Sequence, residues 1–130
     1  MLFLSTQVLE LEMEAGNPRV KKVVCAIDCG IVINPDSAKN MAEGGVVDAI
    51  GTAFYGELKF DQGKPDKNNF DTYRMIRMEE APDAIEVHFV KNDLDPTGLG
   101  EPTYPPTFGA LANALYQGQG KRFYKQPFLG

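Results

Sequence analysis

A single glutamate lies in a loop of glycines and prolines, Gly98-Leu99-Gly100-Glu101-Pro102. Glycine allows backbone angles closed to other residues and lets a bulky group approach the main chain, while the proline stiffens the segment after the acid. A carboxylate held in one pose can act as a general base. The same pattern fits a surface acid in a turn. A third interpretation is a hydrolase that pairs Glu101 with Asp93 or Asp95, which requires two acids at a defined separation.

Other residues that could carry chemistry are few. Cys25 and Cys29 are the only cysteines and His88 is the only histidine, which are too few ligands for a structural zinc site. We expect two reduced, partly buried thiols, with a disulfide between them as the alternative. We expect His88 to be a solvent-facing histidine on a strand rather than a catalytic one.

Composition excludes several classes of function. The chain has 130 residues, 43% of them hydrophobic, which fits one domain with a real core. A net charge of −5 and a pI near 4.8 argue against nucleic acid as a partner, because phosphate binding needs clustered cations. No run of apolar residues is long enough to span a membrane. The apolar start at residues 1–4 is too short for an export signal, so the sequence leaves the location open, with the cytoplasm as the default.

Alternating polar and apolar side chains predict strands at residues 6–14 and 85–89. Residues 20–27 are rich in β-branched side chains and predict a strand that forms an antiparallel hairpin with the first. A short strand is expected at residues 58–60, followed by a turn to residue 65. Residues 66–80 show no clear period and are expected to form an ordered loop.

Two helices are expected. Asn34 is typical of an N-cap with Pro35 at the first helical position, and an apolar face then continues to about Tyr55. This helix carries glycines that each cost about 1 kcal/mol relative to alanine, so either the sheet or a ligand should pack closely against it: Gly44, Gly45 and Gly51. A second helix should begin near Pro105 and end near Gly118. The expected fold is α+β, with a small, mainly antiparallel sheet and two helices packed on it, and residues 1–130 form a single domain.

Four sequence blocks, in this order, carry a resemblance to a known family. They are Val24-Cys25-Ala26-Ile27-Asp28-Cys29-Gly30-Ile31-Val32-Ile33-Asn34-Pro35, Glu43-Gly44-Gly45 with Ile50-Gly51-Thr52-Ala53, Asn69-Phe70-Asp71-Thr72-Tyr73-Arg74, and Gly98-Leu99-Gly100-Glu101-Pro102 with Pro105-Pro106 and Ala110-Leu111-Ala112-Asn113-Ala114. Together they resemble the C-terminal part of the large, molybdenum-binding subunit of the xanthine dehydrogenase/aldehyde oxidase family, nearest to the isoquinoline 1-oxidoreductase β-subunit type. The resemblance implies part of the molybdenum cofactor-binding domain of a molybdenum hydroxylase.

The resemblance also implies roles for individual residues. The family hydroxylates aldehydes or N-heterocycles with oxygen from water, using molybdenum held by a pterin, and its general base corresponds to Glu101. Gly44 and Gly45 belong to the block that approaches the molybdopterin. Met41 stands where the family has a glutamine that contacts the pterin, and methionine cannot donate an amide hydrogen bond. Met41 is therefore expected to be an ordinary core residue.

The matched region is shorter than the family's large chain. The resemblance therefore implies a fragment or shortened homologue that works with missing upstream molybdenum-binding segments or another subunit, and with an iron–sulfur subunit. Alone, the chain would hold no molybdopterin and would not be a competent enzyme. The alternative is a non-catalytic domain that kept the fold, lost the site and associates with itself as a homo-oligomer through its uncovered apolar surface.

Overall fold

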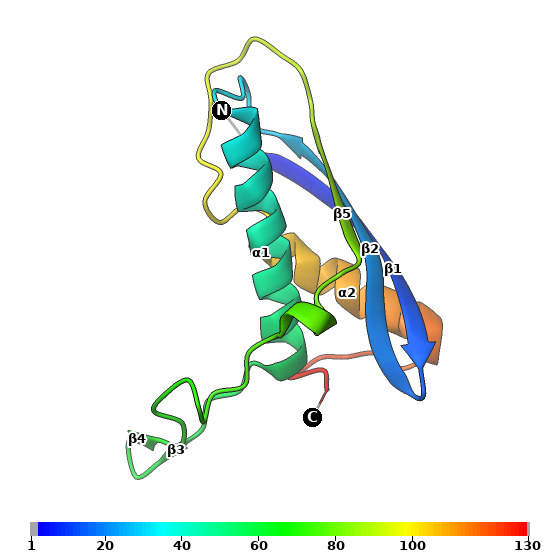
Figure 1. Cartoon of the computed structure of the whole chain (residues 1–130), viewed down its shortest axis with the longest axis vertical. Helices are drawn as coiled ribbons and strands as arrows, with labels where there is room; N and C mark the ends of the chain where they lie inside the picture. Colours follow the sequence, from blue (N-terminus) through cyan, green and yellow to red (C-terminus); the bar gives the residue numbers. More distant parts are fainter. Residues whose placement is uncertain (1–2, 130) are drawn as a thin grey trace.

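The computed structural model describes residues 3–129, which form a three-stranded sheet with two helices packed on one face and a narrow arm extending from the body (Figure 1). The elements of the body, in chain order, are β1 (Leu4–Glu14), β2 (Asn17–Asp28), α1 (Pro35–Tyr55), β5 (Ala84–Phe89) and α2 (Tyr104–Gln119). The segment between α1 and β5 contains β3 (Phe60–Asp61), β4 (Lys64–Pro65) and a short 3₁₀ helix, η1 (Met78–Glu80).

The sheet is mixed, with β2 at its centre and the order β1-β2-β5. The long hairpin of β1 and β2 is antiparallel, whereas β5 runs parallel to β2. A parallel neighbour needs a crossover connection, and α1 with the arm provides it. The expected α+β fold, with a small, mainly antiparallel sheet and two helices, is confirmed. The parallel direction of β5 was not part of that expectation.

The predicted elements differ from the observed ones chiefly at their ends. The first two strands begin earlier than predicted, at Leu4 and Asn17. The expected strand at residues 58–60 is instead Phe60–Asp61, paired with Lys64–Pro65 in a small separate hairpin. The expected loop at 66–80 contains η1 at its end. Both helices follow the prediction.

The core lies between the sheet and the helices. Its fully buried side chains come from the inner face of β2 and from the facing sides of α1 and α2, and include Val23, Cys25, Ile27, Val46, Ile50, Leu111 and Leu115. The Asn34 side chain caps α1 by accepting a hydrogen bond from the Ser37 N–H at 3.0 Å, with Pro35 in the first turn. Apolar residues at helical spacing therefore fix α1 against the sheet, as the pattern predicts.

Both cysteines are free and buried, at 0% and 2% exposure, and so are more buried than expected. Cys25 and Cys29 lie four residues apart on extended chain, a span of about 13 Å, which is beyond the reach of a disulfide. Burial raises the pKa of the Cys25 thiol to about 11. His88 is exposed on the outer face of β5, as predicted. These residues are therefore structural or solvent-facing.

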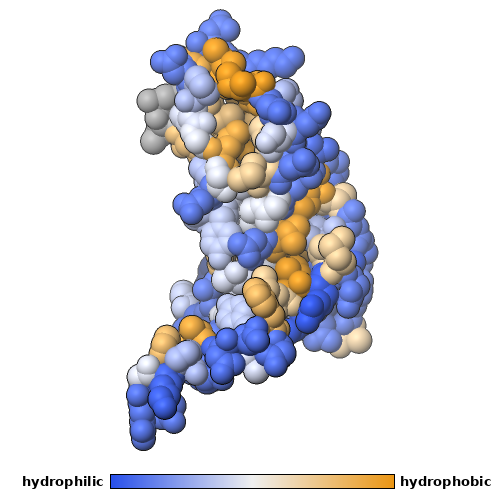
Figure 2. Space-filling model, turned by 60° about the vertical axis from the view of Figure 1, so that its left-hand side comes forward, coloured by the Kyte–Doolittle hydropathy of each residue, from blue (hydrophilic) through white to orange (hydrophobic). Residues whose placement is uncertain are grey.

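The arm carries β3 and β4 at its far end, and Figure 2 shows hydrophilic side chains at its tip. Its return to the body is held by Tyr55, whose hydroxyl donates a 2.8 Å hydrogen bond to Glu80. The Arg74 guanidinium lies 4.0 Å from the centre of the Tyr55 ring and pairs with Glu80. Burial and the hydrogen bond to Glu80 raise the pKa of Tyr55 to about 12.

No helix within residues 3–129 is both long and apolar enough to cross a membrane.

Candidate functional site

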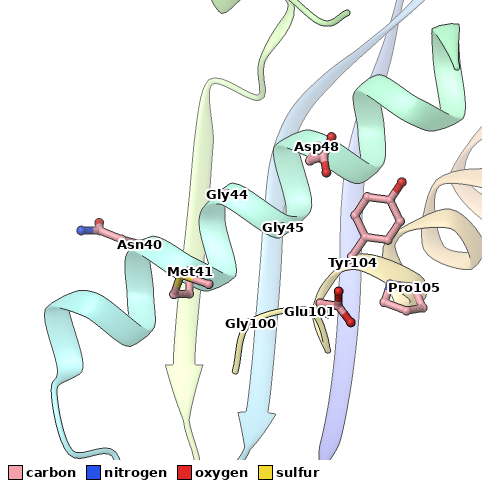
Figure 3. Close-up of a pocket in the computed structure, with 9 residues that line it drawn as sticks. All are labelled: Asn40, Met41, Gly44, Gly45, Asp48, Gly100, Glu101, Tyr104 and Pro105. Atoms are coloured by element: carbon pink, nitrogen blue, oxygen red, sulfur yellow. The ribbon is translucent and has the colours of Figure 1, made fainter. Parts of the chain in front are cut away.

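A hollow of about 590 Å³ lies where α1, the loop before α2 and the first turn of α2 meet (Figure 3). Three segments supply its lining, which consists of Asn40, Met41, Gly44, Gly45 and Asp48 from α1, Gly100 and Glu101 from the loop, and Tyr104 and Pro105 from α2. All four residues singled out from the sequence, Glu101, Met41, Gly44 and Gly45, therefore line one concave surface.

The glycines of α1 have different neighbours. A Cβ added at Gly45 would lie 2.4 Å from the Thr103 hydroxyl oxygen, and one added at Gly51 would lie 2.8 Å from a methyl group of Ile76. At Gly44 the added atom would meet nothing within 4 Å. The close packing expected against this helix is thus made by two loops rather than by the sheet. Gly44 leaves space open on the hollow side.

Because their neighbours differ, replacing Gly44 or Gly45 by alanine should change the stability of the chain in opposite directions. Gly44→Ala should stabilise the chain by about 0.5–1 kcal/mol, because alanine favours the helix and its methyl group meets nothing. Gly45→Ala should destabilise it, because Thr103 is fully buried and has little freedom to retreat. Thermal unfolding of the two variants checks this. A shift of the same sign in both would contradict the difference in packing.

The Glu101 side chain is exposed on the wall of the hollow. Among residues 3–129, no side chain or backbone group forms a hydrogen bond or ion pair with its carboxylate. Its backbone carbonyl accepts a 2.9 Å hydrogen bond from the Tyr104 N–H, which closes the turn into α2. The carboxylate is therefore positioned by its backbone and remains free to bind another group.

The two glycines beside Glu101 act differently from the expectation. Neither Gly98 nor Gly100 has a positive φ, so the loop does not require backbone angles closed to other residues. Close approach does not require glycine at either position: a Cβ added at Gly98 would meet nothing within 4 Å. A Cβ added at Gly100 would lie 4.0 Å from the terminal methyl of Met41, across the hollow from the loop.

The expectation that Met41 is an ordinary core residue is wrong. Its side chain is 44% exposed and lines the hollow. The buried face of α1 includes Ala38, Ala42 and Val46, and Met41 lies beside that face rather than within it. Met41 lies at the edge of the apolar face, and helical periodicity alone could not distinguish that position from one inside the core.

A buried polar network that the sequence did not reveal holds the end of the Glu101 loop. Thr103 and Thr107 are both fully buried. The Gln7 amide, on β1, donates to the Thr103 carbonyl at 2.8 Å, and the Thr107 hydroxyl lies 2.7 Å from the Gln7 side-chain oxygen and 2.9 Å from the Thr103 carbonyl. The Thr103 hydroxyl reaches the Ala42 carbonyl of α1 at 3.4 Å. The loop is thereby joined to both β1 and α1.

The beginning of the same loop is tied to the end of β2. The Asn92 amide donates to the Asp28 carboxylate at 2.8 Å, and the Thr97 N–H donates to the Cys29 carbonyl at 2.9 Å. Gly30 has a φ of +75°, and a Cβ there would lie 2.4 Å from the Asp95 carbonyl oxygen. Only glycine fits this turn without displacing the loop. The long connection that carries Glu101 is therefore fixed at both ends.

The acids proposed as partners for Glu101 are not in the hollow. Asp93 and Asp95 lie in the part of the loop packed near the end of β2, and the second carboxylate of the hollow is Asp48. Asn40 and Asp48 are four residues before and after Gly44, so they share one side of α1. That spacing could have identified both from the sequence. Tyr104 carried no such signal.

The chemistry of the lining limits what the hollow can hold. It combines two carboxylates, a phenol and a carboxamide with the apolar Met41 and Pro105, and it contains no lysine or arginine. Carboxylates accept hydrogen bonds and disfavour nearby anions. The hollow therefore suits a neutral group with N–H donors rather than a phosphate. Within residues 3–129, no three His, Cys, Asp or Glu side chains gather closely enough to hold a metal ion.

Comparison with known proteins identifies relatives. Residues 4–82 match the family model described as molybdopterin cofactor-binding domain. The chain is 31% identical over 108 residues to the β subunit of isoquinoline 1-oxidoreductase from Brevundimonas diminuta, covering 83% of this chain and 14% of that protein. It is 30% identical over 113 residues to the large subunit of nicotine 6-hydroxylase from Paenarthrobacter nicotinovorans, covering 83% of this chain and 14% of that protein. The chain thus spans a small part of the length of these relatives.

Solved structures share the fold. The aldehyde oxidoreductase of Desulfovibrio gigas superposes with a TM-score of 0.79 at 20% identity, covering 96% of this chain and 14% of that one. The quinoline 2-oxidoreductase of Pseudomonas putida 86 gives a TM-score of 0.77 at 21% identity, covering 92% and 16%. The family match includes the glycine-bearing helix, and the match extends over more than half of the chain. The chain accordingly belongs to the molybdopterin cofactor-binding domain family, that of the molybdenum-binding subunits of the xanthine dehydrogenase/aldehyde oxidase enzymes.

Proposed function

We propose that this chain supplies the general-base glutamate and one wall of the cofactor pocket in a molybdenum hydroxylase that acts on an aldehyde or N-heterocycle. The observation that carries this proposal is the hollow itself. Glu101 and the Gly44-Gly45 pair come from distant parts of the sequence and line the same surface. Family membership supports the cofactor, and the geometry supports the role of the acid.

The lining fits the pterin ring of the proposed cofactor on its own chemistry. The open space beside Gly44 allows a flat ring to lie against α1, and the accepting oxygens of Asp48 and Asn40 suit the amino and ring N–H groups of a pterin. Met41 would contribute an apolar contact instead of an amide hydrogen bond. When bound, the molybdenum cofactor supplies the redox chemistry that hydroxylates a carbon with oxygen from water.

Glu101 would move the proton in that reaction. Its carboxylate has no partner among the described residues, so either oxygen can accept a proton from a group placed in the hollow. The hydrogen bonds that fix Thr103 and Thr107 would keep the loop from moving as the proton arrives. Tyr104, on the same wall, would help orient the bound molecule.

We further propose that the chain is not competent alone. The hollow is open to solvent, and the chain spans 14% of the related isoquinoline 1-oxidoreductase chain. Residues 1–130 would then act as one domain of a larger assembly. Upstream molybdenum-binding segments, on the same or another chain, would close the hollow, and an iron–sulfur subunit would receive the electrons.

Metal and pterin analysis tests the proposal. We expect molybdenum and pterin to be absent from the chain purified alone and present in stoichiometric amount when the co-encoded upstream segments are produced with it. In the loaded assembly, Gly44→Leu should reduce the pterin content, because its side chain would fill the space beside α1. Absence of cofactor from both preparations would overturn the catalytic role.

A second candidate is a non-catalytic domain that associates with itself. Met41 in place of a hydrogen-bonding residue favours it, as do exposed apolar side chains such as Ile33 and Phe70, at 78% and 80% exposure. Cofactor analysis separates the two candidates, since this domain would bind no pterin under either condition.

A further inference from the structure

Strand β5 has one paired and one unpaired edge. It is the last strand of the sheet, and β2 is its neighbour. The Val90 N–H donates to the Ile27 carbonyl of β2 at 2.8 Å. The backbone N–H and C=O groups of successive residues in a strand point to opposite edges of that strand. The backbone groups of Glu86 and His88 therefore also face β2. The N–H and C=O groups of Ile85, Val87 and Phe89 therefore face outward. No loop or cap hydrogen bond within residues 3–129 involves these three residues.

The order of side chains in β5 is symmetric about its centre. The strand contains the run Ile85-Glu86-Val87-His88-Phe89. On each side of Val87, the first residue is polar (an acid or a histidine) and the second is large and apolar. The apolar members point toward the helices and are half-buried, whereas Glu86 and His88 are exposed on the open face of the sheet. An acid and a base at mirror positions make this edge complementary to itself.

We propose that two copies of this chain pair antiparallel along β5, with the two-fold axis at Val87. In that register Ile85 of one copy lies opposite Phe89 of the other, and Val87 lies opposite its own counterpart. These are the residues whose backbone groups face outward, so each both donates and accepts a hydrogen bond across the axis. The two sheets become one continuous sheet, a form of β-strand addition.

The same register brings opposite charges together. Glu86 lies opposite His88 of the other copy at two symmetric places. Both belong to pairs without mutual backbone bonds, where opposed side chains approach most closely. Within one copy, Glu86 contacts Lys22 of β2 at 2.6 Å and lies 3.8 Å from His88. An imidazole N–H can donate to the carboxylate of the other copy in either protonation state.

The surroundings of β5 leave room for a second strand. A mostly apolar hollow of about 500 Å³ lies beside its end. Its lining includes Val87, Phe89 and Val90 together with Ile31 and Val32, and also the polar His88, Lys91 and Asn92. Large apolar side chains of an added strand can occupy it. Exposed Ile31 and Val90, at 44% and 48%, would be covered in the dimer. None of the residues that line the Glu101 hollow takes part, so this inference is independent of the proposed function.

Sedimentation analysis over a wide range of concentrations tests the dimer. His88→Glu places acid opposite acid at both contacts, and should raise the dimer dissociation constant by about tenfold or more. Adding Glu86→Lys to it restores opposite charges and should restore association. Val8→Glu introduces the same charge on the open face of β1, at the other edge of the sheet, and should leave association unchanged. A chain that stays monomeric at every concentration overturns the proposal.

Amide hydrogen exchange tests the register. On dimerisation, the N–H groups of Ile85, Val87 and Phe89 should become protected, while those of Glu86 and His88 should keep the protection that β2 already gives them. Val87→Pro removes one outward donor without touching the β2 ladder, and should yield a folded monomer. If the chain dimerises but these three amides exchange as fast as they do in the monomer, another face of the molecule makes the contact, and the proposed pairing is overturned.

Discussion

Replacing Glu101 by glutamine in the assembled, cofactor-loaded enzyme should lower kcat by about 10²–10⁴-fold, the usual contribution of a positioned general base. Glutamine keeps the size and polarity of the side chain but cannot accept the proton. Because the Glu101 carboxylate forms no hydrogen bond or ion pair with any residue from 3 to 129, stability and pterin content should remain unchanged. Steady-state kinetics together with cofactor analysis of the same preparation check both parts.

Asp93→Asn provides the matched control for Glu101→Gln. Asp93 is an exposed acid in the same loop and does not line the hollow. Its substitution should leave kcat unchanged. A similar loss of turnover in both variants would instead favour a pair of carboxylates that work together, and would count against Glu101 as the single base.

Replacing Gly30 by alanine should destabilise the chain by about 1–3 kcal/mol and displace the loop that carries Glu101. Two effects combine at this position. The φ of +75° is strained for alanine, and the added methyl would lie 2.4 Å from the Asp95 carbonyl and 2.8 Å from the Leu94 carbonyl. Since both neighbours are backbone atoms, the loop has to move. Denaturant unfolding and the NMR shifts of residues 92–103 check the result.

Gly63→Ala separates the two effects. Gly63 also has a positive φ, +80°, but a Cβ there meets nothing within 4 Å. Its substitution should show the conformational cost alone and leave the shifts of the Glu101 loop unchanged. Equal destabilisation by Gly30→Ala and Gly63→Ala would mean that contact with the loop contributes nothing at Gly30.

Local sequence signals predicted the parts of the fold that depend on neighbouring residues. Asn34 and Pro35 mark the start of α1, and alternation marks β1 and β5, because caps and periodicity act within a few residues. The parallel direction of β5 depends on how a distant crossover packs, and no local signal encodes it. The edge position of Met41 likewise required the actual orientation of the helix.

The candidate site was predictable only in part, for the same reason. The motif around Glu101 and the pair Gly44-Gly45 were visible as unusual local composition. That they line one hollow depends on the hydrogen bonds of Thr103 and Thr107 to Gln7, which join residues from opposite ends of the chain. Two threonines and a glutamine have no distinctive pattern, so the network that positions the acid could be found only in three dimensions.

The bond from Gln7 to Thr103 joins positions separated by 96 residues. During synthesis, β1 leaves the ribosome long before its partners in α2, and the contact can form only after the residues up to Thr107 have emerged. Contacts between distant residues require closure of a large loop and are slow to form. The segment carrying Glu101 should therefore become ordered last, after the hairpin and α1 have already folded.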